Sequence, residues 1–188
     1  MDPQLEHIYA QAQFGEDWFS YADVYRRMVQ NCRMDGRLVE VGCWKGKSTA
    51  FLLVEAYNRS RKIEVYAVDT WQGSPEHAAD PAVLADTLYD QFMANVAPVA
   101  GQLVPLRIAS PAAADFFPDS SLDGVFIDAA HEYEAVRADI MAWRPKVRPG
   151  GILAGHDFGA GWPGVDLAVT EIFGQVEAGE SCWLVTLT

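Results

Sequence analysis

The chain has 188 residues and a formal net charge of −12, a length that predicts one domain with a sizeable core. Half of its residues are hydrophobic and 21% are charged, as in a soluble globular protein. No apolar run reaches the roughly 18–20 residues that a membrane helix needs, and the first residues lack the basic and apolar regions of a secretory signal. We therefore expect a cytoplasmic location and no membrane partner.

The negative charge disfavours a nucleic-acid partner, because such binding depends on clustered lysine and arginine. The densest basic cluster, residues 59–62, suits the C-terminal end of a helix. Cys32, Cys43 and Cys182 lie far apart, so neither a zinc site nor a disulfide framework is indicated. We expect reduced thiols and a small-molecule partner.

The N-terminal segment is predicted to be helical over residues 4–34. Apolar residues recur there at helical spacing, at Val24, Tyr25, Met28 and Val29. We expect residues 1–35 to form a helical cap or lid and residues 36–188 to form a catalytic domain. The aromatic residues of this segment suit a helix packed across a sheet, a lid that reaches a ligand, or an interface in a homo-oligomer.

From residue 38 onward, strand and helix patterns alternate regularly. Strands are predicted over 38–42, 63–69, 103–109, 124–128 and 152–155, and helices over 48–58, 81–96, 111–117, 132–143 and 165–173. Such alternation is typical of a parallel sheet with right-handed crossovers. Residues 175–177 and 182–188 are too close together for a crossover helix, so they are predicted to form an antiparallel hairpin at the sheet edge.

The carboxyl ends of these strands carry acidic and imidazole groups. Ligands of open parallel sheets bind beyond those ends. The groups expected there are Asp69, Asp128, His131, His156 and Asp157. Their convergence predicts a functional site at this edge.

The stretch 38–49 reads as a strand, a glycine loop and the start of a helix, an arrangement that binds anionic groups. A dinucleotide-binding loop is disfavoured, because Trp44 occupies a position where close approach to a pyrophosphate requires glycine. A P-loop matches Gly46-Lys47-Ser48, but its first glycine would fall on Val41. The loop is therefore one residue too short to cradle a phosphate fully.

A third interpretation uses Val39-Glu40-Val41-Gly42-x-x-x-Gly46 followed by Asp69. This pattern resembles the class I S-adenosylmethionine-dependent methyltransferases. Downstream, the segments 126–133, 138–140, 143–145, 149–158 and 164–165 resemble small methyltransferases related to macrocin O-methyltransferase. The resemblance covers about residues 36–188. It implies a Rossmann-like α/β fold whose seven-stranded sheet is mostly parallel and has an antiparallel C-terminal strand.

The resemblance also implies where S-adenosylmethionine would bind. The methionine side of the cofactor would be lined by Glu40, Gly42, Trp44, Gly46 and Ser48. Asp69 would accept the ribose hydroxyls, with Trp71 nearby, and Ser110 would contact the adenine.

Methyl transfer to a hydroxyl requires that the acceptor lose its proton, either to a base or by coordination to a cation. The catalytic candidates are Asp128, His131, His156 and Asp157. In metal-using relatives an aspartate after strand four and an acidic pair after strand five bind Mg²⁺, and Asp128 and Asp157 match two of these positions. His156 replaces the third, and Mg²⁺ prefers oxygen ligands. Two alternatives stay open: Mg²⁺ held by Asp128 and Asp157, or a histidine base without a metal.

The predicted function is S-adenosylmethionine-dependent O-methylation of a hydroxyl on a sugar or a small natural product. Two alternatives come from other classes. One is a P-loop phosphotransferase, which predicts ATP binding at Lys47 and Ser48. The other is a non-catalytic domain that binds S-adenosylmethionine without turnover.

Overall fold

The computed structural model describes residues 4–15, 18–74 and 77–188. Its centre is a seven-stranded sheet in the order β3-β2-β1-β4-β5-β7-β6. The first five strands in this order pair in parallel, whereas β7 is antiparallel to both β5 and β6. The strands are β1 Arg37–Val41, β2 Glu64–Asp69, β3 Leu103–Arg107, β4 Leu122–Ile127, β5 Val147–Gly155, β6 Glu177–Gly179 and β7 Cys182–Thr186. The predicted mostly parallel sheet and its antiparallel C-terminal hairpin are confirmed.

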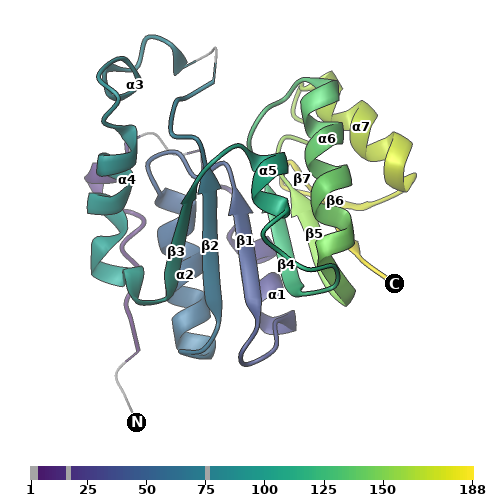
Figure 1. Cartoon of the computed structure of the whole chain (residues 1–188), viewed down its shortest axis with the longest axis horizontal. Helices are drawn as coiled ribbons and strands as arrows, with labels where there is room; N and C mark the ends of the chain where they lie inside the picture. Colours follow the sequence, from purple (N-terminus) through teal and green to yellow (C-terminus); the bar gives the residue numbers. More distant parts are fainter. Residues whose placement is uncertain (1–3, 16–17, 75–76) are drawn as a thin grey trace.

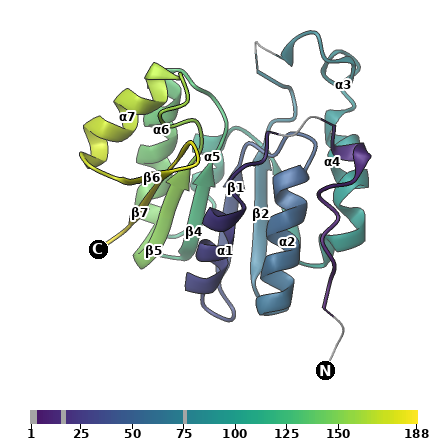
Figure 2. The ribbon, with the colours of Figure 1, turned by 180° about the vertical axis from the view of Figure 1, so that it is seen from behind.

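Helices cover both faces of the sheet. In Figure 1, α5, α6 and α7 lie in front of the strands, and Figure 2 shows α1 and α2 on the opposite face. The helices are α1 Ala22–Asn31, α2 Lys47–Arg59, α3 Pro81–Leu84, α4 Leu88–Val96, α5 Ser110–Ala114, α6 Tyr133–Trp143 and α7 Pro163–Phe173, with 3-10 turns at Ala12–Phe14, Ala97–Gln102 and Arg144–Lys146. None of the helices in the described ranges is both long and apolar enough to cross a membrane.

Each face of the sheet has its own hydrophobic core, because successive side chains of a strand point to opposite faces. In β1, Leu38 packs into the core beneath α1 and α2, whereas Val39 and Val41 pack into the core beneath α6 and α7. The same alternation places Glu40 on the α1 face, where it is fully buried.

The predicted helix over residues 4–34 is wrong for most of its length, since among the residues described there only those of α1 form an α-helix. A glycine with positive φ, Gly15 (76°), ends the short 3-10 turn. Aromatic side chains before α1 instead surround Phe51 of α2, with ring centroids 4.5 Å away for His7 and 5.1 Å for Phe19. The apolar residues of this segment thus come from irregular chain packed on α2. Helix α1 itself packs against α2, β4 and β5, and the lid role stays a prediction.

Two further boundaries differ from the prediction. The predicted helix over 81–96 is divided into α3 and α4, because Asp86 adopts a positive φ of 51° between them. Strand β5 begins at Val147 rather than after the glycine pair, and its register with β4 shifts between Leu122 and Gly124.

Candidate active site

The glycine loop after β1 depends on two glycines with positive φ. Gly42 has φ of 84°, and a Cβ atom there would lie 1.8 Å from the backbone oxygen of Asp128. Gly46 has φ of 87° and caps α2, and its Cβ would lie 2.7 Å from Val96. Side chains at either position would push the loop away from its neighbours. The two predicted glycines therefore hold the loop close to the end of β4 and to α4.

Asp69, at the end of β2, fixes this loop from below. Its Oδ2 accepts hydrogen bonds from the backbone N–H groups of Cys43 (2.8 Å) and Trp44 (3.0 Å), and its Oδ1 accepts one from Trp71 (2.8 Å). The indole of Trp71 is fully buried and donates to the backbone oxygen of Trp44. Trp71 is thus a buried support of the loop, and the ribose contact of Asp69 stays a prediction.

Trp44 is half-buried at the same edge and adopts a positive φ of 47°. Its ring packs on His77, with centroids 4.2 Å apart, and more loosely on Trp18, at 6.3 Å. Lys45 Nζ bonds Asp80 Oδ2 at 2.8 Å and joins the glycine loop to the start of α3. The structure therefore places Trp44 in an aromatic cluster above the glycine loop.

Glu40 lies beneath the loop and has no exposed surface. Its Oε1 accepts hydrogen bonds from the hydroxyls of Tyr25 (2.7 Å) and Ser48, while Oε2 has no hydrogen-bond partner among the described residues. Burial raises the pKa of Glu40 to about 7, although the hydroxyls of Ser48, Thr49 and Tyr25 oppose that rise. An unsatisfied buried carboxylate oxygen is costly, and a cationic ligand group would complete it.

Ser110 starts α5 on the opposite face of the sheet. Its hydroxyl oxygen accepts a hydrogen bond from Trp143 Nε1 at 2.9 Å. Burial raises the pKa of the neighbouring Asp139 to about 6, although a hydrogen bond from Ser110 acts to lower that pKa. The hydroxyl of Ser110 is therefore already hydrogen-bonded to Trp143 of α6, and its adenine contact stays a prediction.

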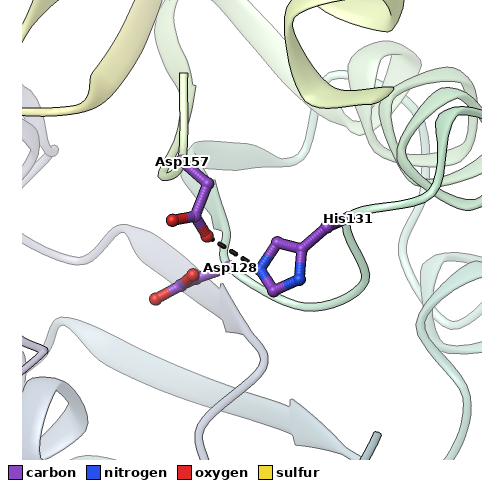
Figure 3. A group of neighbouring side chains, drawn as sticks. All are labelled: Asp128, His131 and Asp157. Carbon is purple, nitrogen blue, oxygen red and sulfur yellow. Dashed lines mark hydrogen bonds and ion pairs between the residues drawn. The ribbon is translucent and has the colours of Figure 1, made fainter. Parts of the chain in front are cut away.

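The four predicted catalytic residues come together beyond β4 and β5. Figure 3 shows Asp128, His131 and Asp157 pointing toward one another. His131 Nε2 lies 2.8 Å from Asp157 Oδ2. His156 Nδ1 lies 3.3 Å from Asp157 Oδ1 and 3.6 Å from Asp128 Oδ1. Two carboxylates and two imidazoles thus form one cluster.

His156 and Asp157 shift each other's pKa in this cluster. Burial alone would lower the pKa of His156, but the carboxylates of Asp128 and Asp157 outweigh burial and raise it to about 9. Burial would likewise raise the pKa of Asp157, but His131 and His156 hold it well below its usual range. At neutral pH, His156 is therefore a cation between two carboxylates, and Asp157 is ionised.

The cluster includes a candidate metal site, because one ligand atom from each of Asp128, His131 and Asp157 lies within 4.8 Å of the other two. That donor set combines two oxygens with one nitrogen, whereas Mg²⁺ takes oxygen ligands and water. Imidazole suits transition metals better. In addition, the charged His156 already lies between the two carboxylates predicted to bind Mg²⁺. The residues present therefore do not fit Mg²⁺.

Three aromatic residues at the site were not assigned a specific contact from the sequence. Tyr21 donates a hydrogen bond to Asp128 Oδ2 at 2.6 Å, and Tyr25 binds Glu40 as described. Trp162 is 38% exposed and stacks on His131, with ring centroids 3.9 Å apart and planes 18° apart. Tyr21 and Tyr25 are separated by one helical turn in the sequence, but the predicted apolar helix face included only Tyr25.

Comparison with known proteins agrees with this geometry. A family model described as a methyltransferase domain matches residues 39–158. A curated relative, the uncharacterized protein y4gI of Sinorhizobium fredii (strain NBRC 101917 / NGR234), is 33% identical over 121 residues, which are 64% of this chain but 13% of that protein. The chain therefore spans only about an eighth of the length of that relative.

Solved structures share the fold at low sequence identity. The O-methyltransferase NovP has a TM-score of 0.69 and 18% identity, covering 89% of this chain and 79% of NovP. CalS11, a TDP-rhamnose 3'-O-methyltransferase, has a TM-score of 0.59 and 19% identity, covering 88% and 76%. A rRNA methylase from Clostridium thermocellum, described as putative, has a TM-score of 0.60 and 13% identity, covering 90% and 96%. These likenesses show the Rossmann-like methyltransferase fold.

The family model covers well over half of the chain, including the glycine loop, Asp69 and the cluster beyond β4 and β5. This family membership implies S-adenosylmethionine as the methyl donor. The chain therefore belongs to the methyltransferase-domain family.

Proposed function

We propose that this chain transfers a methyl group from S-adenosylmethionine to a hydroxyl of a small molecule, either a sugar or a small natural product. The observation that carries this proposal is the Asp157–His131 pair, joined at 2.8 Å, at the same sheet edge as the glycine loop. The resemblance to the macrocin-related branch supports the same reaction.

The cofactor residues fit the shape and charge of S-adenosylmethionine. Glu40 Oε2, which has no hydrogen-bond partner in the described part of the chain, would receive the ammonium group of the methionine portion, and the loop from Gly42 to Gly46 would line that portion. Asp69 and Ser110 would face the ribose and the adenine. When bound, the cofactor supplies an electrophilic methyl group on its sulfonium.

His131 is the proposed general base. Asp157 fixes one ring nitrogen of His131, and Trp162 stacks on the ring, so the imidazole is held in one orientation for proton transfer. His156 is unsuited to that role, because it is protonated at neutral pH. It instead balances the charges of Asp128 and Asp157. Orientation and exclusion of water would supply much of the remaining rate.

We propose that the transfer does not require Mg²⁺, because the candidate ligands include the imidazole of His131 and the cationic His156 lies between the two carboxylates. Purified enzyme treated with EDTA should retain its initial rate within twofold. If EDTA abolished the activity and a titration with Mg²⁺ restored it to a plateau, this part of the proposal would be contradicted.

The acceptor class follows from charge and from the structural neighbours. CalS11 acts on TDP-rhamnose, as its name states, so TDP-rhamnose is the first acceptor to test, followed by free deoxysugars and phenolic natural products. The likeness to a rRNA methylase concerns the fold, and the net charge of −12 disfavours RNA. A phosphotransferase is not favoured, since the family match covers the loop that would bind ATP.

The proposal is tested by calorimetric titration with S-adenosylhomocysteine and by transfer of labelled methyl groups to the acceptor panel. We expect micromolar binding of S-adenosylhomocysteine and no binding of ATP. His131→Gln should lower kcat by about 10²–10⁴-fold, the range for a positioned base, and leave the affinity for S-adenosylhomocysteine unchanged. His7→Gln, at a histidine stacked on Phe51, is the control. ATP binding, or full activity of His131→Gln, would contradict the proposal, whereas binding without transfer to any acceptor would favour a non-catalytic domain.

A further inference from the structure

Helix α1 brings two tyrosine hydroxyls to two different carboxylates of the proposed site. Tyr21, at the start of α1, donates to Asp128 Oδ2 at 2.6 Å, and Tyr25, one turn later, donates to Glu40 Oε1 at 2.7 Å. Asp128 belongs to the acceptor end of the site and Glu40 to the cofactor end. One helix therefore contacts both halves of the proposed reaction centre.

The spacing of these contacts follows from helix and strand geometry. Glu40 of β1 pairs in register with Phe126 of β4, so Asp128 lies two residues farther along the same direction. Two strand residues span roughly 6.6 Å, and four helical residues span roughly 6 Å. A helix running opposite to the strands thus places Tyr21 and Tyr25 at the two carboxylates.

Both phenol rings are held firmly by packing. Tyr21 is 3% exposed and Tyr25 is fully buried. The Tyr21 ring stacks on Phe126 at 4.5 Å, and the Tyr25 ring meets the same Phe126 edge-on at 4.9 Å. Tyr21 also lies 4.8 Å from the ring of His156. Because the rings cannot turn freely, their hydroxyls fix the positions of the carboxylate oxygens that they bind.

Each tyrosine occupies one oxygen of its carboxylate and leaves the other for the site. With Tyr21 on Oδ2 of Asp128, Oδ1 faces His156. With Tyr25 on Oε1 of Glu40, Oε2 stays without a partner among the described residues. Hydrogen bonds to ionised groups are stronger than neutral ones, so these contacts decide which oxygen is presented.

We propose that α1 is a positioning helix, in which Tyr21 orients Asp128 for the acceptor and Tyr25 orients Glu40 for the methionine portion of the cofactor. This inference rests on the proposed methyl transfer. It assigns separate effects to two tyrosines of one helix, which a helix serving only to cover the sheet would not produce.

The test compares Tyr21→Phe with Tyr25→Phe, because each substitution removes a single hydroxyl and keeps the ring. Tyr21→Phe should lower kcat by about tenfold or more, the factor that corresponds to 1.36 kcal/mol, with the Kd for S-adenosylhomocysteine changed less than twofold. Tyr25→Phe should raise that Kd about tenfold, with a smaller change in kcat at saturating S-adenosylmethionine. Transfer is measured with TDP-rhamnose, or with another acceptor that the panel shows to be methylated.

Tyr66→Phe is the matched control, because Tyr66 also donates to a carboxylate, that of Glu64 at 3.0 Å, outside the site. It should change neither kcat nor Kd. Equal effects of Tyr21→Phe and Tyr25→Phe on the binding of S-adenosylhomocysteine would overturn the inference, and this titration needs no acceptor. Failure of the wild-type chain to bind S-adenosylhomocysteine would instead overturn the proposed function.

Discussion

Replacement of Glu40 by glutamine should make the protein more stable at neutral pH while weakening cofactor binding. Burial raises the pKa of Glu40 from 4.5 to about 7, and each pH unit of displacement corresponds to 1.36 kcal/mol. The ionised carboxylate therefore lowers the free energy of unfolding by about 3 kcal/mol above pH 7. Because the pKa of Glu40 is higher in the folded state than in the unfolded state, the contribution of this side chain to stability is fully present below about pH 4.5. It is lost as the pH rises through 7.

Glutamine removes that titration but keeps the shape of the side chain. Its amide oxygen can still accept hydrogen bonds from the hydroxyls of Tyr25 and Ser48. Weaker neutral hydrogen bonds offset part of the gain. We expect a net stabilisation of about 1–2 kcal/mol at pH 8, or a rise in Tm of ~4 °C for a chain of this size.

Urea unfolding of the wild type and of Glu40→Gln between pH 5 and pH 8.5 measures this difference, with Glu64→Gln on the surface as control. The advantage of Glu40→Gln should grow between pH 5 and pH 7 and then level off. The Kd for S-adenosylhomocysteine should rise at least tenfold, because the ammonium group loses its carboxylate. A stability difference that does not vary with pH, or a glutamine variant less stable than wild type at pH 8, would refute the reasoning.

Three other substitutions probe separate parts of the structure. Asp123→Asn should lower the free energy of unfolding, measured in urea, by about 3 kcal/mol at pH 7. Arg33 and Arg148 bind this fully buried carboxylate. Burial alone would raise the pKa of Asp123, but the two arginines outweigh burial and hold it below its usual range. That deficit should shrink as the pH falls below 4, where the wild-type carboxylate becomes protonated. Gly42→Ala should abolish binding of S-adenosylhomocysteine in calorimetry, because its Cβ would meet the Asp128 oxygen at 1.8 Å; unchanged affinity would contradict the loop geometry. Trp162→Ala should reduce kcat about tenfold in the methyl-transfer assay with unchanged Kd for S-adenosylhomocysteine, since the stacking on His131 is lost.

The parallel sheet could be predicted because its sequence signals are local. The runs predicted as strands over 38–42, 63–69 and 124–128, each ended by glycine or aspartate, coincide with β1, β2 and β4 to within two residues. The carboxyl ends of parallel strands then meet by topology alone, which is why Asp128, His131, His156 and Asp157 could be grouped before their contacts were known.

The N-terminal segment could not be predicted in the same way. Its aromatic residues resemble a helical face in sequence, but their partners, above all Phe51 of α2, lie far along the chain. The hydrogen bonds of Tyr21 and Tyr25 could not be predicted either, since an apolar pattern does not show which hydroxyl donates to a residue on a distant strand. Tertiary contacts of this kind override local propensity.

The two ends of the site balance charge in different ways, and this difference indicates what each end receives. At the acceptor end, the cationic His156 lies between the carboxylates of Asp128 and Asp157 within the chain itself. At the cofactor end, the hydrogen-bond partners of Glu40 among the described residues are neutral hydroxyls. A buried carboxylate with neutral partners gains most from a ligand that brings its own cation, as the ammonium of S-adenosylmethionine does. The acceptor end, where His156 already supplies a cation, suits a neutral hydroxyl whose proton leaves to the imidazole of His131.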